Sequence, residues 1–172
     1  MKKLVLGIFL SASLIACTNT EKKTEIVEQK STPIEHIYKP TYTDNFKIGD
    51  PKNVSIIEQF HQAVFAKDYA KVGSFIVDTA VFYNEDGTTL KGKDALIDFM
   101  KKNYSTLNIK NYNVGVSLSV IGENGHEWVL MWDDADVETP DGKTQKYQWM
   151  DAYRLENGKV IAFNGFGKNP KP

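Results

Sequence analysis

The sequence predicts an α+β domain in which three helices precede a strongly curved antiparallel sheet. In the segments 51–65 and 93–104, apolar residues recur at helical spacing. After Asn108 the pattern changes, and three turn signals ending in glycine divide the chain into long strands. Long strands with an apolar face must curl around the elements that they cover.

The helical half begins at a clear start signal. Asp50 can cap a helix, Pro51 suits its first position, and apolar side chains follow at intervals of three and four residues to Phe65. The elements predicted next are a helix over 69–75, a strand over 79–84 that turns at Asp86-Gly87, and a helix over 93–104 preceded by Gly92.

The sheet half is divided by turns at 123–125, 140–142 and 156–158, each of which ends in Asn-Gly or Asp-Gly. These pairs suit tight hairpins because both residues tolerate positive φ. Between Val114 and Val120, apolar residues alternate with glycine and serine, which predicts one apolar face. On the next strand, Val129 and Met131 are expected to point outward.

The N-terminus predicts a secretory signal, because two lysines precede an apolar run from Leu4 to Ala16. As a helix this run would cover roughly 20 Å, less than the membrane core of about 30 Å. It ends in Leu14-Ile15-Ala16-Cys17, which resembles the lipobox of bacterial lipoproteins. The resemblance implies a signal peptide over 1–16 and a lipidated Cys17. The polar composition that follows predicts a tether over 17–50, whose later part, from Ile34 to Phe46, either stays free or packs on the domain. The folded domain is expected over 51–168.

Lipid on Cys17 implies a membrane as partner and the cell envelope as location. The membrane would be the outer one in a Gram-negative cell, with the domain facing the periplasm or the cell surface. Cys17 is the single cysteine, so an intrachain disulfide, a cysteine nucleophile and a cysteine zinc site are not expected. Without the signal the chain has 19 basic and 22 acidic residues, a net charge of −3, which argues against nucleic acid.

Four segments carry a resemblance to a known fold. In chain order they are 66–72, which reads as a helix break, 77–82 as a strand entry, 92–96 as a helix start and 151–160 as a final hairpin. Their order is similar to that of the NTF2-like (SnoaL-like) superfamily. The resemblance implies a cone-shaped half-barrel with a pocket between sheet and helices, and in many members a dimer through the outer sheet face.

The superfamily includes ketosteroid isomerases, polyketide cyclases, epoxide hydrolases and transport factors, so the fold alone does not give the function. The isomerase chemistry needs an aspartate base, and a tyrosine and a protonated aspartic acid that bind the oxyanion. Asp151 matches the oxyanion aspartate, whereas the tyrosine position holds Phe60 and the base position holds Tyr83. Steroid isomerisation is therefore not expected.

A pocket is predicted around the strand over 146–155, where alternation places Tyr147, Trp149, Asp151 and Tyr153 on one face. Asp151 either contacts a ligand or is a structural or solvated carboxylate. On the preceding strand, Trp132 shares a face that is either core or pocket wall. The predicted ligand pocket consists of Phe60, Tyr83, Trp132, Tyr147, Trp149 and Asp151.

No metal or cofactor is expected. Alternation places Asp134 and Asp136 on one strand face and Asp133 on the other, and no histidine is near them in sequence. The three are therefore interpreted as a solvated strand end. His61 lies beside the apolar face of the first helix. It joins Asp151 and Tyr83 as a candidate for acid–base chemistry.

Three functions remain open. The first is an anchored module that binds a small apolar or amphipathic ligand, or a protein partner, without catalysis. The second is a SnoaL-like enzyme of the isomerase, cyclase or hydrolase type that uses Asp151 as acid or base. The third is a module that assembles as a homodimer through its sheet.

Overall fold

The computed structural model describes residues 35–43 and 45–168. The chain divides into two compact units, 1–37 and 38–172, and all helices and strands of the described residues belong to the second unit. The predicted signal peptide and Cys17 lie outside the described residues. Within the described part of the chain, no helix is long and apolar enough to cross a membrane.

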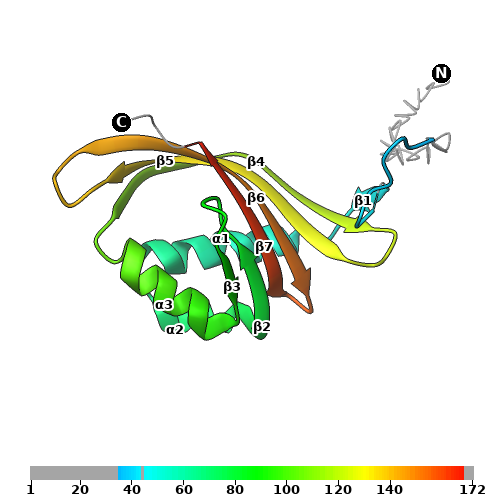
Figure 1. Ribbon diagram of the computed structural model, residues 1–172, viewed down its shortest axis with the longest axis horizontal. Coiled ribbons are helices and arrows are strands. Elements are labelled where there is room, and N and C mark those ends of the chain that lie inside the picture. Colours follow the sequence, from blue (N-terminus) through cyan, green and yellow to red (C-terminus); the bar gives the residue numbers. More distant parts are fainter. Residues whose placement is uncertain (1–34, 44, 169–172) are drawn as a thin grey trace, which may run out of the picture. The chain divides into compact units, whose positions relative to one another are not determined.

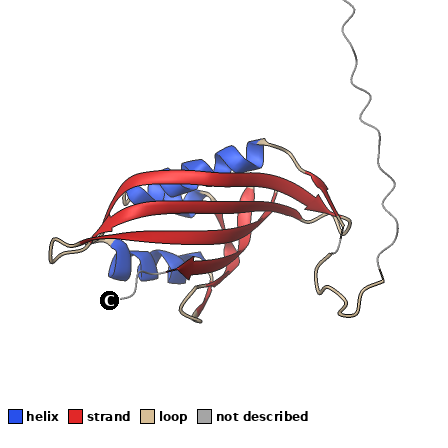
Figure 2. Cartoon of the chain, turned by 90° about the horizontal axis from the view of Figure 1, so that it is seen from above, coloured by secondary structure: helices blue, strands red, loops and turns tan. Residues whose placement is uncertain are grey.

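Three helices lie against one side of a seven-stranded sheet (Figures 1 and 2). The sheet order is β1-β4-β5-β6-β7-β2-β3. Neighbouring strands are antiparallel except β2 and β7, which are parallel. The elements are β1 Phe46–Ile48, α1 Lys52–Phe65, α2 Tyr69–Ser74, β2 Ile76–Tyr83, β3 Thr89–Lys91, α3 Lys93–Tyr104, β4 Asn108–Gly122, β5 Glu127–Glu138, β6 Thr144–Glu156 and β7 Lys159–Lys168.

The predicted α+β architecture is confirmed. Helix α3 has the predicted bounds, and the three hairpin turns fall where Asn-Gly and Asp-Gly indicate them. Residues 46–48, assigned to the tether, instead form β1 at the sheet edge, paired with β4. This strand is short and exposed, so its sequence carries no alternation that would reveal it.

The core lies between the helices and the concave side of the sheet. Ile57 and Phe60 of α1 pack there with Val129 and Met131 of β5. The prediction that Val129 and Met131 point outward is therefore wrong, since neither has measurable exposure. Both faces of β5 are apolar, so alternation could not decide which one meets the helices.

Strand β4 changes face along its length. Val114 pairs with Asp133 but Val116 pairs with Trp132, so one extra residue, Gly115, lies between two consecutive pairs. Such a bulge turns the following side chains to the other face. Val114 packs on the core while Val116 is exposed on the outer face, and the single apolar face predicted for this segment is wrong at that point.

Candidate functional site

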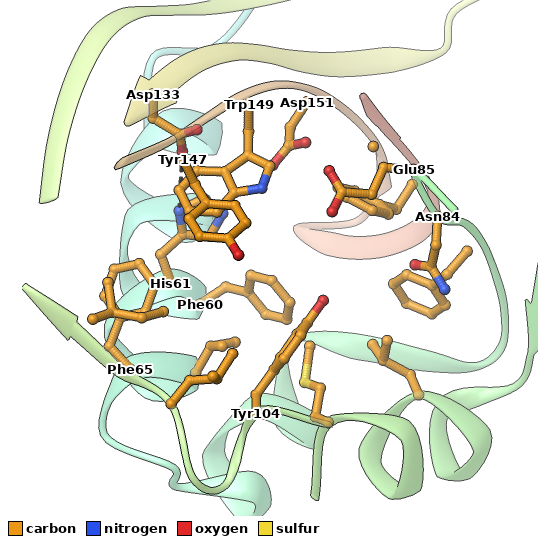
Figure 3. A pocket seen from close by; sticks show the side chains of 18 of the residues that line it. Phe60, His61, Phe65, Asn84, Glu85, Tyr104, Asp133, Tyr147, Trp149 and Asp151 are labelled. Atoms are coloured by element: carbon orange, nitrogen blue, oxygen red, sulfur yellow. Dashed lines mark ion pairs between the residues drawn. The ribbon is translucent and has the colours of Figure 1, made fainter. Parts of the chain in front are cut away.

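A cavity of about 390 Å³ lies between α1, α3 and the concave side of the sheet. This volume falls within the range of about 300–1,000 Å³ usual for small-molecule sites. Most of its wall is apolar or aromatic. Figure 3 shows Asp133, Trp149 and Asp151 at one end of the cavity and Phe65 and Tyr104 at the other.

Four of the six predicted pocket residues line this cavity. They are Phe60 from α1 and Tyr147, Trp149 and Asp151 from β6. Alternation along β6 points the last three to the same side, as predicted, and the rings of Tyr147 and Trp149 stack with centroids 5.8 Å apart. His61 also lines the cavity, so two of the three candidates for acid–base chemistry come together there.

Tyr83 does not belong to the site. It is the last residue of β2, its side chain is 45% exposed, and it does not line the cavity. Phe82 points inward instead and forms part of the wall. The assignment of Tyr83 to the pocket is wrong by one residue, which reverses the face of a strand.

Trp132 lies on the outer face of the sheet. In the register between β5 and β6, Met131 is opposite Asp151 and Trp132 is opposite Met150. Directly opposed residues share a face, so Met131 faces the helices with Asp151. The indole of Trp132 points away and is 41% exposed, and its assignment to the pocket is wrong.

Asp133 lines the cavity although the sequence did not predict it there. Its interpretation as part of a solvated strand end is wrong, because it is buried and lines the cavity. Asp134, its neighbour, does face outward and forms an ion pair with Lys146 at 2.6 Å. Alternation separates Asp133 from Asp134 as predicted, but the sequence does not show that the face of Asp133 is the buried one.

Five polar side chains from four elements form one continuous chain at the acidic end of the cavity. The Tyr112 hydroxyl donates to Asp133 Oδ2 at 2.5 Å and lies 2.6 Å from His61 Nδ1. The Tyr153 hydroxyl lies 2.7 Å from His61 Nε2 and 3.1 Å from Asp151 Oδ2. The order is therefore Asp133, Tyr112, His61, Tyr153, Asp151.

Burial determines the charge of each member. Desolvation lowers the pKa of His61 to about 4, so the imidazole is neutral near pH 7. Burial, reinforced by the nearby charge of Asp133, holds the pKa of Asp151 well above its usual range. Burial also raises the pKa of Asp133, although the hydrogen bond from Tyr112 opposes this.

One carboxylate oxygen of each aspartate has no partner. Asp133 Oδ1 and Asp151 Oδ1 are buried and accept no hydrogen bond from the described residues. His61, Asp133 and Asp151 bring ligand-type atoms within 4.8 Å of one another, a spacing that a metal ion could use. Both ring nitrogens of His61 already bond to tyrosine hydroxyls, so the arrangement favours a hydrogen-bonded chain over a metal centre.

Tyr112 belongs to the site although the sequence analysis did not single it out. It reaches the site because β4 is irregular on both sides of it, with register shifts between Lys110 and Asn113 and between Val114 and Val116. Asn111 has a φ of 49° in the first of these irregularities. Asparagine tolerates that conformation, and it is the available signal for a local break in the strand.

A family model described as SnoaL-like domain matches residues 57–163, which span α1 to β7. The chain belongs to the SnoaL-like family. The match includes each residue of the polar chain and most of the cavity wall. A search of curated protein sequences found no match.

Solved structures share the fold of this SnoaL-like domain. A ketosteroid isomerase-like protein from Erwinia carotovora atroseptica matches with a TM-score of 0.58 and 11% identity, over 71% of this chain and 100% of that one. An LEH-like epoxide hydrolase from M. tuberculosis gives 0.56 and 12%, over 68% and 83%. A putative SnoaL-like polyketide cyclase from Shewanella putrefaciens gives 0.54 and 11%, over 68% and 80%. At these identities the likeness shows the fold alone.

Proposed function

We propose that this SnoaL-like protein is a lipid-anchored envelope protein that binds a small, flat, mainly apolar ligand carrying one polar group. The cavity is the observation that carries the proposal. Its aromatic walls suit a flat apolar body, and its two buried aspartates, Asp133 and Asp151, lie together at one end. Such a distribution orients a ligand while burying most of its surface.

The binding half is tested with N-phenyl-1-naphthylamine, a flat apolar fluorophore. The chain from residue 17 onward with Cys17→Ser lacks the predicted signal peptide and cannot be lipidated, so it needs no detergent, which would compete for the probe. We expect saturable fluorescence at one probe per chain, and at least about tenfold weaker binding in Trp149→Ala. Tyr83→Phe, outside the cavity, serves as control. A linear, unsaturable signal would exclude the pocket as a ligand site.

The anchor rests on the sequence that ends at Cys17. Acylated cysteine holds a protein to a membrane, because each buried CH₂ contributes about 0.8 kcal/mol. We expect radiolabelled palmitate to enter the protein in growing cells and the protein to sediment with membranes. Cys17→Ser should abolish the label. A labelled Cys17→Ser protein would contradict this assignment.

Acid–base catalysis is a second candidate, favoured by the buried carboxyls beside the cavity. His61 and Asp151 converge there through Tyr153, while Tyr83 does not. Perturbed titratable groups in a cavity are typical of active sites. The test is deuterium uptake by 2-tetralone in D₂O, followed by NMR. Catalysis requires uptake above the buffer rate that Asp151→Asn removes, and equal rates would exclude this activity.

Assembly is a third candidate, supported by an exposed apolar row on the outer sheet face. The row consists of Val116, Trp132, Met150 and Phe166. They lie opposite one another across β4, β5, β6 and β7. A second copy of this chain is the partner that we infer, and sedimentation velocity of the chain with and without a charge in this row tests it.

A further inference from the structure

The polar chain at the end of the cavity needs a fixed number of hydrogen atoms to complete its hydrogen bonds. It contains four hydrogen bonds, from Asp133 to Tyr112, from Tyr112 to His61, from His61 to Tyr153 and from Tyr153 to Asp151. Each bond needs one hydrogen. The two tyrosines and the neutral histidine supply one each, and the fourth must come from a carboxyl group.

With a neutral imidazole, which burial favours by lowering the pKa of His61 to about 4, only one proton count on the two carboxyls fills all four bonds without a surplus. If both carboxyls were ionised, one bond would lack a hydrogen and two negative charges would be buried. No lysine or arginine among the described residues lines the cavity to offset them. If both were protonated, one hydrogen would be left on an oxygen that has no acceptor. One proton on the pair, with a net charge of −1, fills every bond of the chain.

We propose that Asp133, Tyr112, His61, Tyr153 and Asp151 form a proton relay that holds one negative charge and has no spare hydrogen, so that the free Oδ1 of Asp151 accepts a hydrogen bond from an O–H or N–H group of the ligand. The inference rests on the proposed ligand-binding function. It narrows the ligand class to flat, mainly apolar compounds with a hydroxyl or N–H donor, such as phenols.

The shorter of the two carboxyl bonds favours Asp133 as the ionised group. The bond from Tyr112 to Asp133 is 2.5 Å, the length of a charge-assisted O–H···O⁻ bond, whereas the one between Tyr153 and Asp151 is 3.1 Å. Asp133 is thus the ionised end and Asp151 the protonated end, with its hydrogen on Oδ2 toward Tyr153.

Other groups around Asp151 support this assignment. Glu85, in the turn between β2 and β3, faces the same cavity and further raises the pKa of Asp151. Tyr104 of α3 also lines the cavity, and burial raises its pKa to about 12, so it stays neutral. From the described elements around the cavity, only acidic or neutral side chains face Asp151.

Asp151 lies beside Gly165 of β7, and both line the cavity. A Cβ at Gly165 would lie 3.6 Å from Asp151 Oδ1 and 2.7 Å from Phe163 Cζ, so the Phe163 ring packs against the backbone beside the free oxygen. Asp151 itself is only 8% exposed, so a hydrogen bond made there is shielded from water and correspondingly strong.

A proton taken from the ligand can travel the whole chain. When Asp151 Oδ1 takes the proton, the hydrogen on Oδ2 passes to Tyr153, and the Tyr153 hydrogen passes to His61 Nε2. The hydrogen on His61 Nδ1 then passes to Tyr112, and the Tyr112 hydrogen passes to Asp133. Each middle member gains one proton and loses one. The ligand keeps the electron pair of its broken O–H or N–H bond, and the negative charge moves from Asp133 to the ligand.

The first experiment counts protons without any ligand. Infrared spectroscopy of the full chain at pH 7 should show one protonated carboxyl group per molecule. Asp151→Asn should remove this band, since Asp133 stays ionised, and Asp133→Asn should keep it. Asp134→Asn, on the outer face, is the matched control and should change nothing. Two protonated carboxyls, or none, would overturn the relay.

The second experiment tests the direction of the ligand hydrogen bond. The probes are 2-naphthol, which donates, and 2-methoxynaphthalene, which only accepts, with the Cys17→Ser chain. We expect 2-naphthol to bind at least about tenfold more tightly. The preference should collapse in Asp151→Leu, which has no acceptor, and persist in Tyr83→Phe and in Asp151→Asn, whose amide donates to Tyr153 and still offers an oxygen.

The two experiments separate the two proposals. Equal affinity for both probes would overturn the acceptor role of Asp151 while leaving the binding pocket intact. If neither probe binds, the proposed ligand-binding function is wrong, and so is the ligand class inferred from it. In either case, the number of protonated carboxyl groups measured by infrared spectroscopy tests the relay independently of the ligand.

Discussion

At the scale of single residues, the main feature is a set of titratable side chains buried where they cannot all be charged. Asp133, Asp151 and His61 lie together under the sheet with little exposure. An isolated buried charge is strongly unfavourable, so such groups change protonation or share hydrogen bonds. Tyr112 and Tyr153 allow the sharing, because each hydroxyl bridges a carboxyl group and the imidazole.

Replacing Asp151 should change how stability depends on pH. The folded protein keeps a proton on Asp151 that the unfolded chain releases near the ordinary pKa of 3.8. The folded state therefore loses stability as the pH rises from about 4 through the raised pKa. Asparagine does not titrate. The stability of Asp151→Asn relative to the original chain should rise over this window and then level off. The total rise should be about 1.4 kcal/mol for each unit by which the pKa of Asp151 is raised.

Urea unfolding between pH 4 and pH 8 measures this difference. Asp134→Asn is the control with the opposite sign, since Lys146 lowers the pKa of Asp134. Its stability relative to the original chain should fall as the pH rises toward about 4 and stay level from there to pH 8. A pH-independent difference for Asp151→Asn would mean that Asp151 ionises as freely in the folded state as in the unfolded chain.

Tyr153→Phe removes one hydroxyl and leaves two buried partners unsatisfied. His61 Nε2 and Asp151 Oδ2 both lose the group that lies between them. An unsatisfied buried polar group costs about 1–3 kcal/mol, so we expect a loss of about 3 kcal/mol in the free energy of unfolding. Tyr147→Phe is the matched control, because its hydroxyl only reaches Gln145 at 3.4 Å. A loss below about 0.5 kcal/mol for Tyr153→Phe would show that the bridge contributes nothing.

At the scale of elements, the order of helices and strands could be predicted from the sequence because turn chemistry is local. Asn-Gly and Asp-Gly pairs, and the cap before α1, act within a few residues. The faces of the strands were predicted less well. On β5 both faces are apolar, so Trp132 was assigned to the pocket and Asp133 to solvent, because only pairing with β6 shows which face is buried.

Long-range pairing explains the remaining gaps. β1 is held only by its bonds to β4, and β2 lies beside β7 in parallel although the two are far apart in sequence. Neither pairing is indicated by a pattern in the local sequence. Within the site, β6 presents its residues as predicted, since its alternation is unbroken from Tyr147 to Tyr153. Tyr112 could not be placed in the same way, because the bulges of β4 change which face it occupies.

The hairpin between β6 and β7 gives a prediction at this scale. Asn157 and Gly158 form a two-residue loop between the paired residues Glu156 and Lys159, and both have positive φ, 51° and 71°. A residue with a Cβ pays roughly 1–2 kcal/mol in this region, and a Cβ at Gly158 would lie 3.3 Å from Ile56 Cδ1. Gly158→Ala should therefore lower the free energy of unfolding by at least about 1 kcal/mol.

Chemical denaturation of Gly158→Ala beside Gly115→Ala makes the comparison specific. A Cβ at Gly115 meets its nearest atom at an ordinary 3.5 Å, and no positive φ is required there. We expect a change within about 0.5 kcal/mol for that control. Equal losses in the two variants would mean that the turn conformation is not what stabilises the hairpin.

At the scale of the whole molecule, the two faces of the sheet have different chemistry. The concave face carries the core, the cavity and the buried polar chain. The outer face carries the exposed row of Val116, Trp132, Met150 and Phe166. A contiguous exposed apolar patch marks an interaction site more often than not. The row crosses β4 to β7, so a partner would cover the strands that hold Asp133 and Asp151 on their other side.

The partner that fits this row is a second copy of the chain. A twofold axis through the row would place each apolar side chain against the same set in the other copy, which is how most homodimers form. Asp134 and Lys146, beside the row, are already paired with each other, so two copies would not repel at that point.

We expect a dimer in sedimentation velocity at micromolar concentration. Trp132→Glu should shift it to a monomer, because a charge would be buried at the centre of the contact. Ile48→Glu, at an apolar and even more exposed position on β1, should leave the dimer intact. A monomer for the unmodified chain, or a dimer that survives Trp132→Glu, would exclude this face as the contact between copies.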